Sequence, residues 1–207
     1  QHDMSIDIQF KTERLYEIVQ IGVHEGKRVQ EIDDIKHEAL CLFEVKSQPN
    51  GSFKQPDYYV IYEHFSQDNF FGQDILANDA IKFAHATLLS VPASVSLQVN
   101  DGKYYEFFAA WVNEGKQEQL QKFFEASQPI KEKYGRPAPI FHVQFQPATS
   151  TDETPFFTSL IAGLVEWDHY SDVEALLGNK EFQNLAAPLF GEAISRMEMI
   201  LGKVVKL

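Results

Sequence analysis

Hydrophobic and polar positions follow one order of elements twice along the chain. Residues 15–24 are apolar on both alternations, which is typical of a strand covered on its two faces. The pattern then predicts a helix over 28–38, strands over 39–45 and 58–65, a helix over 73–89 and a strand over 94–99. An Asn50-Gly51 turn makes the two middle strands antiparallel neighbours, and Asn100-Asp101-Gly102 marks the end of this half.

The second half gives the same order with longer helices. It predicts strands over 104–113, 140–145, 160–167 and 197–205, and helices over 116–134 and 172–194. Both halves therefore read β-α-β-β-α-β, the ferredoxin-like arrangement of a four-stranded antiparallel sheet with two helices on one face.

A local sequence repeat supports this duplication. YEIVQIGVHEGK, residues 16–27, returns 89 residues later as YEFFAAWVNEGK. Six of the twelve aligned positions are identical, where roughly one is expected by chance. The sequence thus predicts two copies of one small domain, over residues 13–100 and 102–207.

The sheet face that carries no helices is apolar in both copies, so it must be buried against something. In the second copy Tyr105, Phe107, Ala109 and Trp111 form one alternation, and the other is also apolar. The nearest partner is the other copy, which a short linker holds at high effective concentration. We therefore expect an α+β chain whose two ferredoxin-like repeats pack as an α/β-barrel pseudo-dimer, with a further homodimer left open.

Composition limits the classes of partner that we expect this chain to bind. The net charge is -12 and no Lys/Arg block occurs, which argues against nucleic acid and anionic membrane surfaces. No long apolar run or basic leader is present, so the expectation is a soluble, cytoplasmic protein. A small molecule or another protein remains as the partner.

Motifs for cofactors and metals are missing from the sequence. Cys41 is the single cysteine, which excludes an internal disulfide and a cysteine zinc cluster. The histidines show no metal-ligand spacing, and Gly26 and Gly115 are single turn glycines rather than a phosphate loop. We therefore expect no metal and no nucleotide cofactor.

Two segments resemble a known family. The first is ALCLFEV followed by DYYVIYEHFSQDNFFGQDILANDAIKFAHATLL, and the second is GLVEWDHYSDVEALLGNKEFQNLAAPL. Both resemble the antibiotic biosynthesis monooxygenase-like domains of the dimeric α/β-barrel superfamily. The resemblance implies paired sheets with helices outside, and activities that include cofactor-independent oxygenation of aromatic quinols, haem degradation, isomerisation and dehydration.

Four residues are candidates for acid–base or binding roles. Trp167 resembles the family's strand-end tryptophan, although it follows Glu166 one residue too early, and Phe65 replaces it in the first half. His142 lies within a predicted strand, where it can point into a cavity or serve a structural role. His24 and Asn113 occupy equivalent strand ends, where they are either site residues or turn residues.

The leading function is the binding of a small aromatic molecule and its oxygenation without a cofactor, because a histidine or acid in an apolar pocket can remove a phenolic proton. The first alternative is a non-catalytic binding or stress-associated barrel. The second is haem binding, because His85 resembles the axial histidine on the second helix of haem-degrading members.

Overall fold

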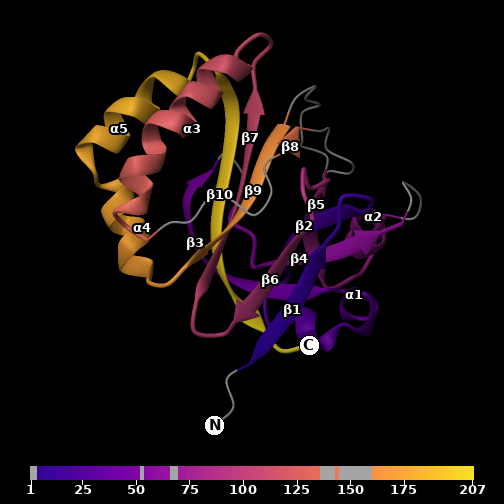
Figure 1. The fold of residues 1–207 in the computed structure, drawn as a ribbon. Helices are drawn as coiled ribbons and strands as arrows, with labels where there is room; N and C mark the ends of the chain where they lie inside the picture. The colour runs from indigo at the N-terminus through magenta and orange to yellow at the C-terminus, as the bar shows by residue number, and fades with distance from the viewer. Residues whose placement is uncertain (1–3, 52–53, 66–69, 136–142, 145–159) are drawn as a thin grey trace.

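The computed structural model describes residues 4–51, 54–65, 70–135, 143–144 and 160–207 (Figure 1). Strands and helices alternate in short blocks along this part of the chain. The strands are β1 (Ser5–Phe10), β2 (Leu15–Val23), β3 (Cys41–Gly51), β4 (Tyr58–His64), β5 (Ile81–Leu89), β6 (Val95–Asn100), β7 (Tyr104–Val112), β8 (Val143–Gln144), β9 (Leu160–Trp167) and β10 (Ile194–Val205). The helices are η1 (Val29–Glu31), α1 (Asp33–Lys36), α2 (Phe71–Leu76), α3 (Gln117–Glu132), α4 (Tyr170–Leu177), α5 (Lys180–Ala186) and η2 (Ala187–Leu189).

The fold is α+β, built on a large antiparallel sheet. Eight strands pair in the order β5-β2-β4-β3-β10-β7-β9-β8, and β1 and β6 form a separate two-stranded sheet. The first half contributes β5-β2-β4-β3 and the second β10-β7-β9-β8, so each half places its fourth, first, third and second strand in the same order. Pairing of β3 with β10 joins the halves.

Equivalent side chains make equivalent contacts in the two halves. The Tyr16 hydroxyl accepts a hydrogen bond from Lys11 N, and the Tyr105 hydroxyl accepts one from Asn100 N. Ion pairs flank both tyrosines, Arg14 with Glu63 and Lys103 with Glu166. The turn glycines Gly26 and Gly115 both adopt a positive φ, of 80° and 76°. The two halves therefore make similar tertiary contacts outside the YE…EGK segment.

The sheet is strongly curved. Strands β4 and β3 lie between β2 and β10, which would separate β2 from β10 by about 14 Å in a flat sheet. Nevertheless, Gln20 Nε2 on β2 donates to Glu198 Oε2 on β10 at 2.6 Å. The concave face thus forms an interior whose largest cluster takes buried side chains from both halves and from the β1–β6 ribbon, among them Phe10, Ile18, Ile61, Val99, Phe107 and Leu164.

Helices cover the opposite, convex face (Figure 1). In the first half a cluster around Val19, Ile35 and Ile75 packs the short helices α1 and α2 against β2 and β4. In the second half α3, α4 and α5 pack over β7, β9 and β10 (Figure 1). No helix in the described ranges is long and apolar enough to cross a bilayer.

The strands predicted over 15–24, 58–65, 104–113 and 160–167, and the helix over 116–134, are confirmed as β2, β4, β7, β9 and α3. Of the strand predicted over 140–145, the structure describes β8 alone. The strand predicted over 39–45 begins at Cys41 as β3, which is longer and extends through the expected turn to Gly51.

The helix predicted over 73–89 is wrong beyond Leu76. The chain turns at Asn78, whose Oδ1 accepts from Ala80 N, and residues 81–89 form strand β5. This strand is buried on both faces, and an apolar run without alternation does not distinguish a strand from a helix. Consequently β5 is the fourth strand that the first half contributes to the main sheet. The strand predicted over 94–99 is β6, which pairs with β1 outside the main sheet.

Two further helix predictions are too long. Residues 28–38 form only η1 and α1. Residues 172–194 break at Gly178, after which Asn179 Oδ1 accepts from Phe182 N and caps a new helix, α5. The boundary between repeats at residues 100–102 stays a prediction.

Candidate functional site

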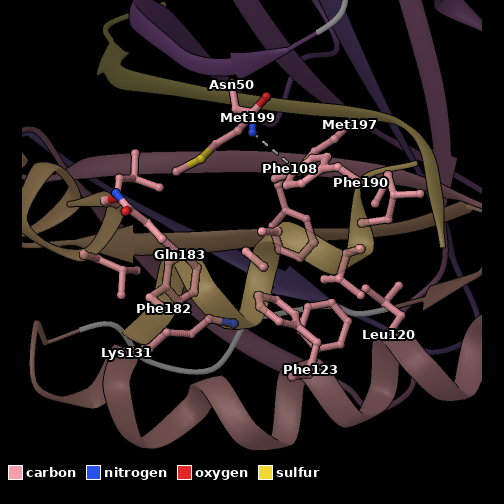
Figure 2. Close-up of a pocket in the computed structure, with 18 of the residues that line it drawn as sticks. Asn50, Phe108, Leu120, Phe123, Lys131, Phe182, Gln183, Phe190, Met197 and Met199 are labelled. Carbon is pink, nitrogen blue, oxygen red and sulfur yellow. Dashed lines mark hydrogen bonds between the residues drawn. The ribbon is translucent and has the colours of Figure 1, made fainter. Parts of the chain in front are cut away.

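A pocket lies between the convex face of the sheet and the helices of the second half (Figure 2). Its volume is about 270 Å³, just below the range of typical ligand pockets, roughly 300–1,000 Å³. Aromatic rings and thioethers from β7, β10, α3 and α5 line it, including Phe108, Phe123, Phe124, Phe182, Met197 and Met199. Such walls suit a flat aromatic ligand, because rings stack on rings and methionine adapts to them.

A buried carboxylate belongs to this pocket. Glu106 on β7 lines the pocket and is only 1% exposed. The indole Nε1 of Trp167 on β9 donates to Glu106 Oε1 at 2.9 Å, and Trp167 is itself fully buried. A buried carboxylate requires such hydrogen bonds to offset its lost hydration. Trp167 therefore fixes the orientation of the acid beside the pocket.

The corresponding acid of the first half has a different environment. Glu17 accepts hydrogen bonds from Phe71 N, Gly72 N and His64 Nε2, each at 2.8 Å. Both carboxylate oxygens are engaged, and the two backbone donors lie at the start of α2. Glu17 thus fastens a short helix onto the sheet, whereas Glu106 lies beside a pocket.

The sequence comparison paired Trp167 with the wrong residue of the first half. Leu15 pairs with His64 across β2 and β4, and Tyr104 pairs with Trp167 across β7 and β9, so His64 is the counterpart of Trp167. Phe65 is 77% exposed and lies beneath the Arg14 guanidinium. The prediction of Phe65 is wrong because the family spacing is counted from the glutamate, and the sequence does not give the strand register.

The other predicted site residues do not gather at the pocket. Asn113 follows β7, and its Nδ2 donates to Glu192 O at 2.9 Å. His24 is exposed after β2, where its backbone N–H bonds Ala80 O. Both positions fit turn residues that tie one strand end to the next. His142 lies outside the described residues, so its role stays a prediction.

His85 lies on strand β5 and faces the concave interior, so its predicted place on a helix is wrong. It pairs in register with Gln20, and the same register in the second half pairs Glu198 with Ala109. Its counterpart is therefore Glu198 and not a residue near Leu185. The two counterparts meet, with His85 Nε2 3.7 Å from Glu198 Oε1. This placement gives no support to a haem-ligand role.

The interior cluster brings buried side chains of opposite charge together. Arg196 Nη2 donates to Glu198 Oε1 at 3.0 Å, and its guanidinium lies 4.8 Å from the ring centre of Trp111. Burial, followed by the nearby Arg196 charge, lowers the pKa of His85 to about 3. Burial raises the pKa of Glu198 to about 7 against the opposing effects of Gln20 and Arg196. The histidine is consequently neutral at pH 7, and the carboxyl group changes its charge near neutrality.

This cluster predicts a pH-dependent effect of His85→Gln. Wild-type His85 stays neutral in the native state down to about pH 3, whereas in the unfolded chain it takes up a proton below about pH 6.5. The stability that neutral His85 contributes is present above pH 6.5 and is lost as the pH falls, by at most about 1.4 kcal/mol per pH unit. Urea unfolding between pH 8 and pH 4.5 should therefore show the variant gaining stability relative to wild type on acidification.

The exposed His37→Gln is the matched control for this series and should track wild type. Parallel pH curves for wild type and His85→Gln would contradict a buried neutral imidazole.

The described part of the chain offers few residues that could bind a metal or act as a nucleophile. No cluster of three or more His, Cys, Asp or Glu side chains suited to a metal ion occurs there. Cys41 is buried on β3, and burial raises the pKa of its thiol to about 12, so the reactive thiolate is disfavoured.

Comparison with solved structures identifies the fold. An anthrone oxidase-like protein, known from a crystal structure, aligns with a TM-score of 0.59 at 10% identity over 97% of this chain and 94% of that one. The two chains share one fold. No protein-family model and no curated protein matches the sequence.

Two bacterial proteins described as candidate monooxygenases are more distant. The protein from Lactobacillus acidophilus aligns with a TM-score of 0.43 at 12% identity, over 94% of this chain and 100% of that one. The protein from Fusobacterium nucleatum aligns with a TM-score of 0.44 at 10% identity, over 94% of both chains. These two likenesses are too weak to define the fold.

The sequence points to Trp167 but not to Glu106 and Lys131, the charged side chains that line the pocket among the residues that the structure describes. Glu106 was visible as an identity of the repeat, where it served only to align the halves. An acid inside an otherwise apolar strand is itself a signal, because glutamate is rarely buried without a partner.

Proposed function

We propose that the second-half pocket binds a small aromatic molecule with an acidic hydroxyl or methylene group, and that the chain catalyses its oxygenation without a cofactor. The observation that carries this proposal is the buried Glu106, oriented by Trp167 at the wall of an aromatic-lined pocket. The fold shared with an anthrone oxidase-like protein is consistent with it.

Glu106 is the proposed proton acceptor. A carboxylate held in a water-poor site beside the substrate can remove a proton from a phenol or an activated methylene, which makes the ring electron-rich enough to react with O₂. The net reaction for a methylene is R₂CH₂ + O₂ giving R₂C=O + H₂O. The carbon supplies the four electrons, one oxygen atom becomes the carbonyl oxygen, and the other leaves as water with both hydrogens. No further reductant is required.

We further propose that the two halves are tandem ferredoxin-like units that close into a barrel. The common strand order, the matching tyrosine and ion-pair contacts, and the contacts across the curved interior support this arrangement. We place the catalytic pocket in the second half, where Glu106 lines an aromatic cavity, whereas Glu17 bonds the start of α2 and His64.

The direct test is oxygen uptake by metal-free protein with anthrone, 2-naphthol and catechol, with bound ligand measured in parallel by fluorescence. Uptake above the protein-free rate supports the oxygenase. Binding with no uptake for any compound would replace it with a non-catalytic binding protein. If no compound binds and none causes oxygen uptake, the proposed function is overturned.

Blocking the pocket should remove this activity without unfolding the protein. Ala186 on α5 lines the pocket and is partly exposed, so Ala186→Phe places a ring in the cavity from a helix that can tolerate it. We expect ligand affinity to fall by about tenfold or more, because displaced contacts in an apolar site are worth at least ~1–2 kcal/mol.

Ala126→Phe makes the same substitution on the exposed face of α3 and should bind like wild type. Equal ligand affinity in the two variants would place the binding site elsewhere.

A further inference from the structure

The first half of the chain supplies a polar side chain to the pocket of the second half. Strand β3 continues past its predicted end at residue 45, and its last residues pair with β10. Asn50 lies opposite Met199 in this pairing, and partners in register project from the same face of the sheet. Both side chains line the pocket (Figure 2). The pairing of β3 with β10 therefore brings an amide of the first half to the pocket.

Asn50 lies at the rim of this pocket. It is exposed to solvent, and Figure 2 shows it across the cavity from Phe123 of α3. A further contact holds this end of β3 on the second half, because the Tyr170 hydroxyl on α4 donates to Ser47 Oγ at 3.1 Å. The amide is thus carried by a paired strand, which gives it a defined position beside the cavity.

The other polar side chains that line the pocket contact groups of the protein. Glu106 accepts a hydrogen bond from Trp167. Gln183 Nε2 donates to Leu177 O at 2.8 Å. The Lys131 ammonium lies near aromatic rings of α3 and has a further partner in the protein. These contacts leave Asn50 as the rim residue whose polar atoms are most accessible to a ligand.

The Asn50 amide retains most of its hydrogen-bonding capacity. Its Nδ2 lies 3.9 Å from Met197 Sδ, and a thioether sulfur is only a weak acceptor. Within the part of the chain that the structure describes, its Oδ1 accepts no hydrogen bond. A few placed polar groups usually fix how a ligand lies in an apolar pocket. The rim therefore presents both a donor and an acceptor for this purpose.

We infer that Asn50 selects an aromatic ligand with a second oxygen substituent, a carbonyl or a hydroxyl group, which bonds the amide at the rim of the pocket. This inference rests on the ligand binding in the proposed function and adds the substituent that accompanies the acidic group. Strand β10 separates Glu106 on β7 from Asn50 on β3, so the two strands lie about 10 Å apart across the sheet. The acidic group and the oxygen substituent are consequently expected at opposite ends of the ligand.

The test compares ligands with and without the oxygen substituent, by fluorescence titration under nitrogen at pH 7. The ketone 6-acetyl-2-naphthol is paired with 6-isopropenyl-2-naphthol, and naphthalene-2,6-diol is paired with 6-methyl-2-naphthol, so that each pair keeps its shape. Wild type should bind at least one oxygen compound about threefold to tenfold more tightly than its partner, which is the usual range for one neutral hydrogen bond.

Two variants of Asn50 identify the contact. Asn50→Leu keeps the approximate size of the side chain and should lose the preference. It should bind the oxygen-free compounds like wild type, which also shows that it is folded. Asn50→Asp removes the amide donors, so it should lose a preference for the ketone, whose oxygen can only accept. Asn184→Leu, on the exposed side of α5, is the control and should behave like wild type.

The outcomes separate this inference from the proposed function. Equal affinity of wild type within both pairs overturns the inference and leaves the pocket as a binding site. A preference that survives in Asn50→Leu also overturns it, because another group would then bind the oxygen. The inference likewise fails if Asn50→Leu weakens all four compounds equally, since Asn50 would then only support the pocket wall. A preference without oxygen uptake in air supports the inference and removes the oxygenation. If none of the four compounds binds wild type, both proposals fail.

Discussion

Glu106→Gln should lower oxygen uptake by about 100-fold or more while the protein still binds its aromatic ligand. The amide keeps the size of the side chain but cannot accept the substrate proton, and general base catalysis typically contributes 10²–10⁴-fold. The variant should therefore lose reaction rate and keep its ligand affinity, whereas a packing defect would lower both. Steady-state oxygen consumption and a fluorescence titration on the same sample measure the two quantities.

Two controls accompany this variant. Glu118→Gln changes an exposed acid on α3 and should leave both quantities unchanged. Trp167→Phe keeps a large ring but removes the donor to Glu106, so it should slow uptake less than Glu106→Gln does. If Glu106→Gln retains the wild-type rate, the proton acceptor is another group and the proposed mechanism is wrong.

Arg196→Met should destabilise the protein by about 3–5 kcal/mol at high pH, the usual effect of removing one partner of a buried ion pair. Glu198 is fully buried and would lose its cation. Without Arg196 its native pKa rises above the wild-type value of about 7, so the native variant retains a proton at pH values where native wild type has lost it. In the unfolded state, Glu198 binds its proton equally in the variant and in wild type.

The higher native pKa of Glu198 in the variant decides how the destabilisation by Arg196→Met changes with pH. Below about pH 7 native Glu198 is protonated in both proteins, and the destabilisation is smallest there. Above pH 7 the variant loses stability relative to wild type as the pH rises. Denaturant unfolding at pH 5.5 and pH 9 measures this change, with the exposed Arg28→Met as the control. A destabilisation that is equal at the two pH values would contradict a buried Glu198 that ionises near neutrality.

Elements with a local signal could be predicted from the sequence, and elements defined by pairing could not. The strand of Tyr16 and its repeat at Tyr105 were evident because both alternations are apolar and a glycine turn follows. Strand β5 was missed because its apolar run is compatible with a helix, and only pairing with β2 decides between them. The error over β5 also moved His85 from the interior to a helix.

The sequence predicts only part of the candidate site, because the rest depends on contacts between distant parts of the chain. Trp167 was found through its strand-end position. Glu106 appears in the sequence only as a repeat identity, and local sequence does not show that Glu17 bonds the start of α2 whereas Glu106 lines a pocket. Lys131 carries no local signal of its burial, because a lysine in the last turn of a helix usually reaches solvent. Long-range packing, rather than local propensity, created the pocket.

The three methionines offer the most direct test of the pocket as the binding site. Met197 and Met199 line the pocket, whereas Met4 lies near the N-terminus and packs against the interior cluster. Methyl NMR of protein carrying ¹³C-methyl methionine therefore gives two reporters at the site and one away from it. On titration with 2-naphthol, we predict that the Met197 and Met199 signals shift in a saturable manner and that the Met4 signal does not. Saturable binding that leaves both pocket signals unchanged would contradict the account.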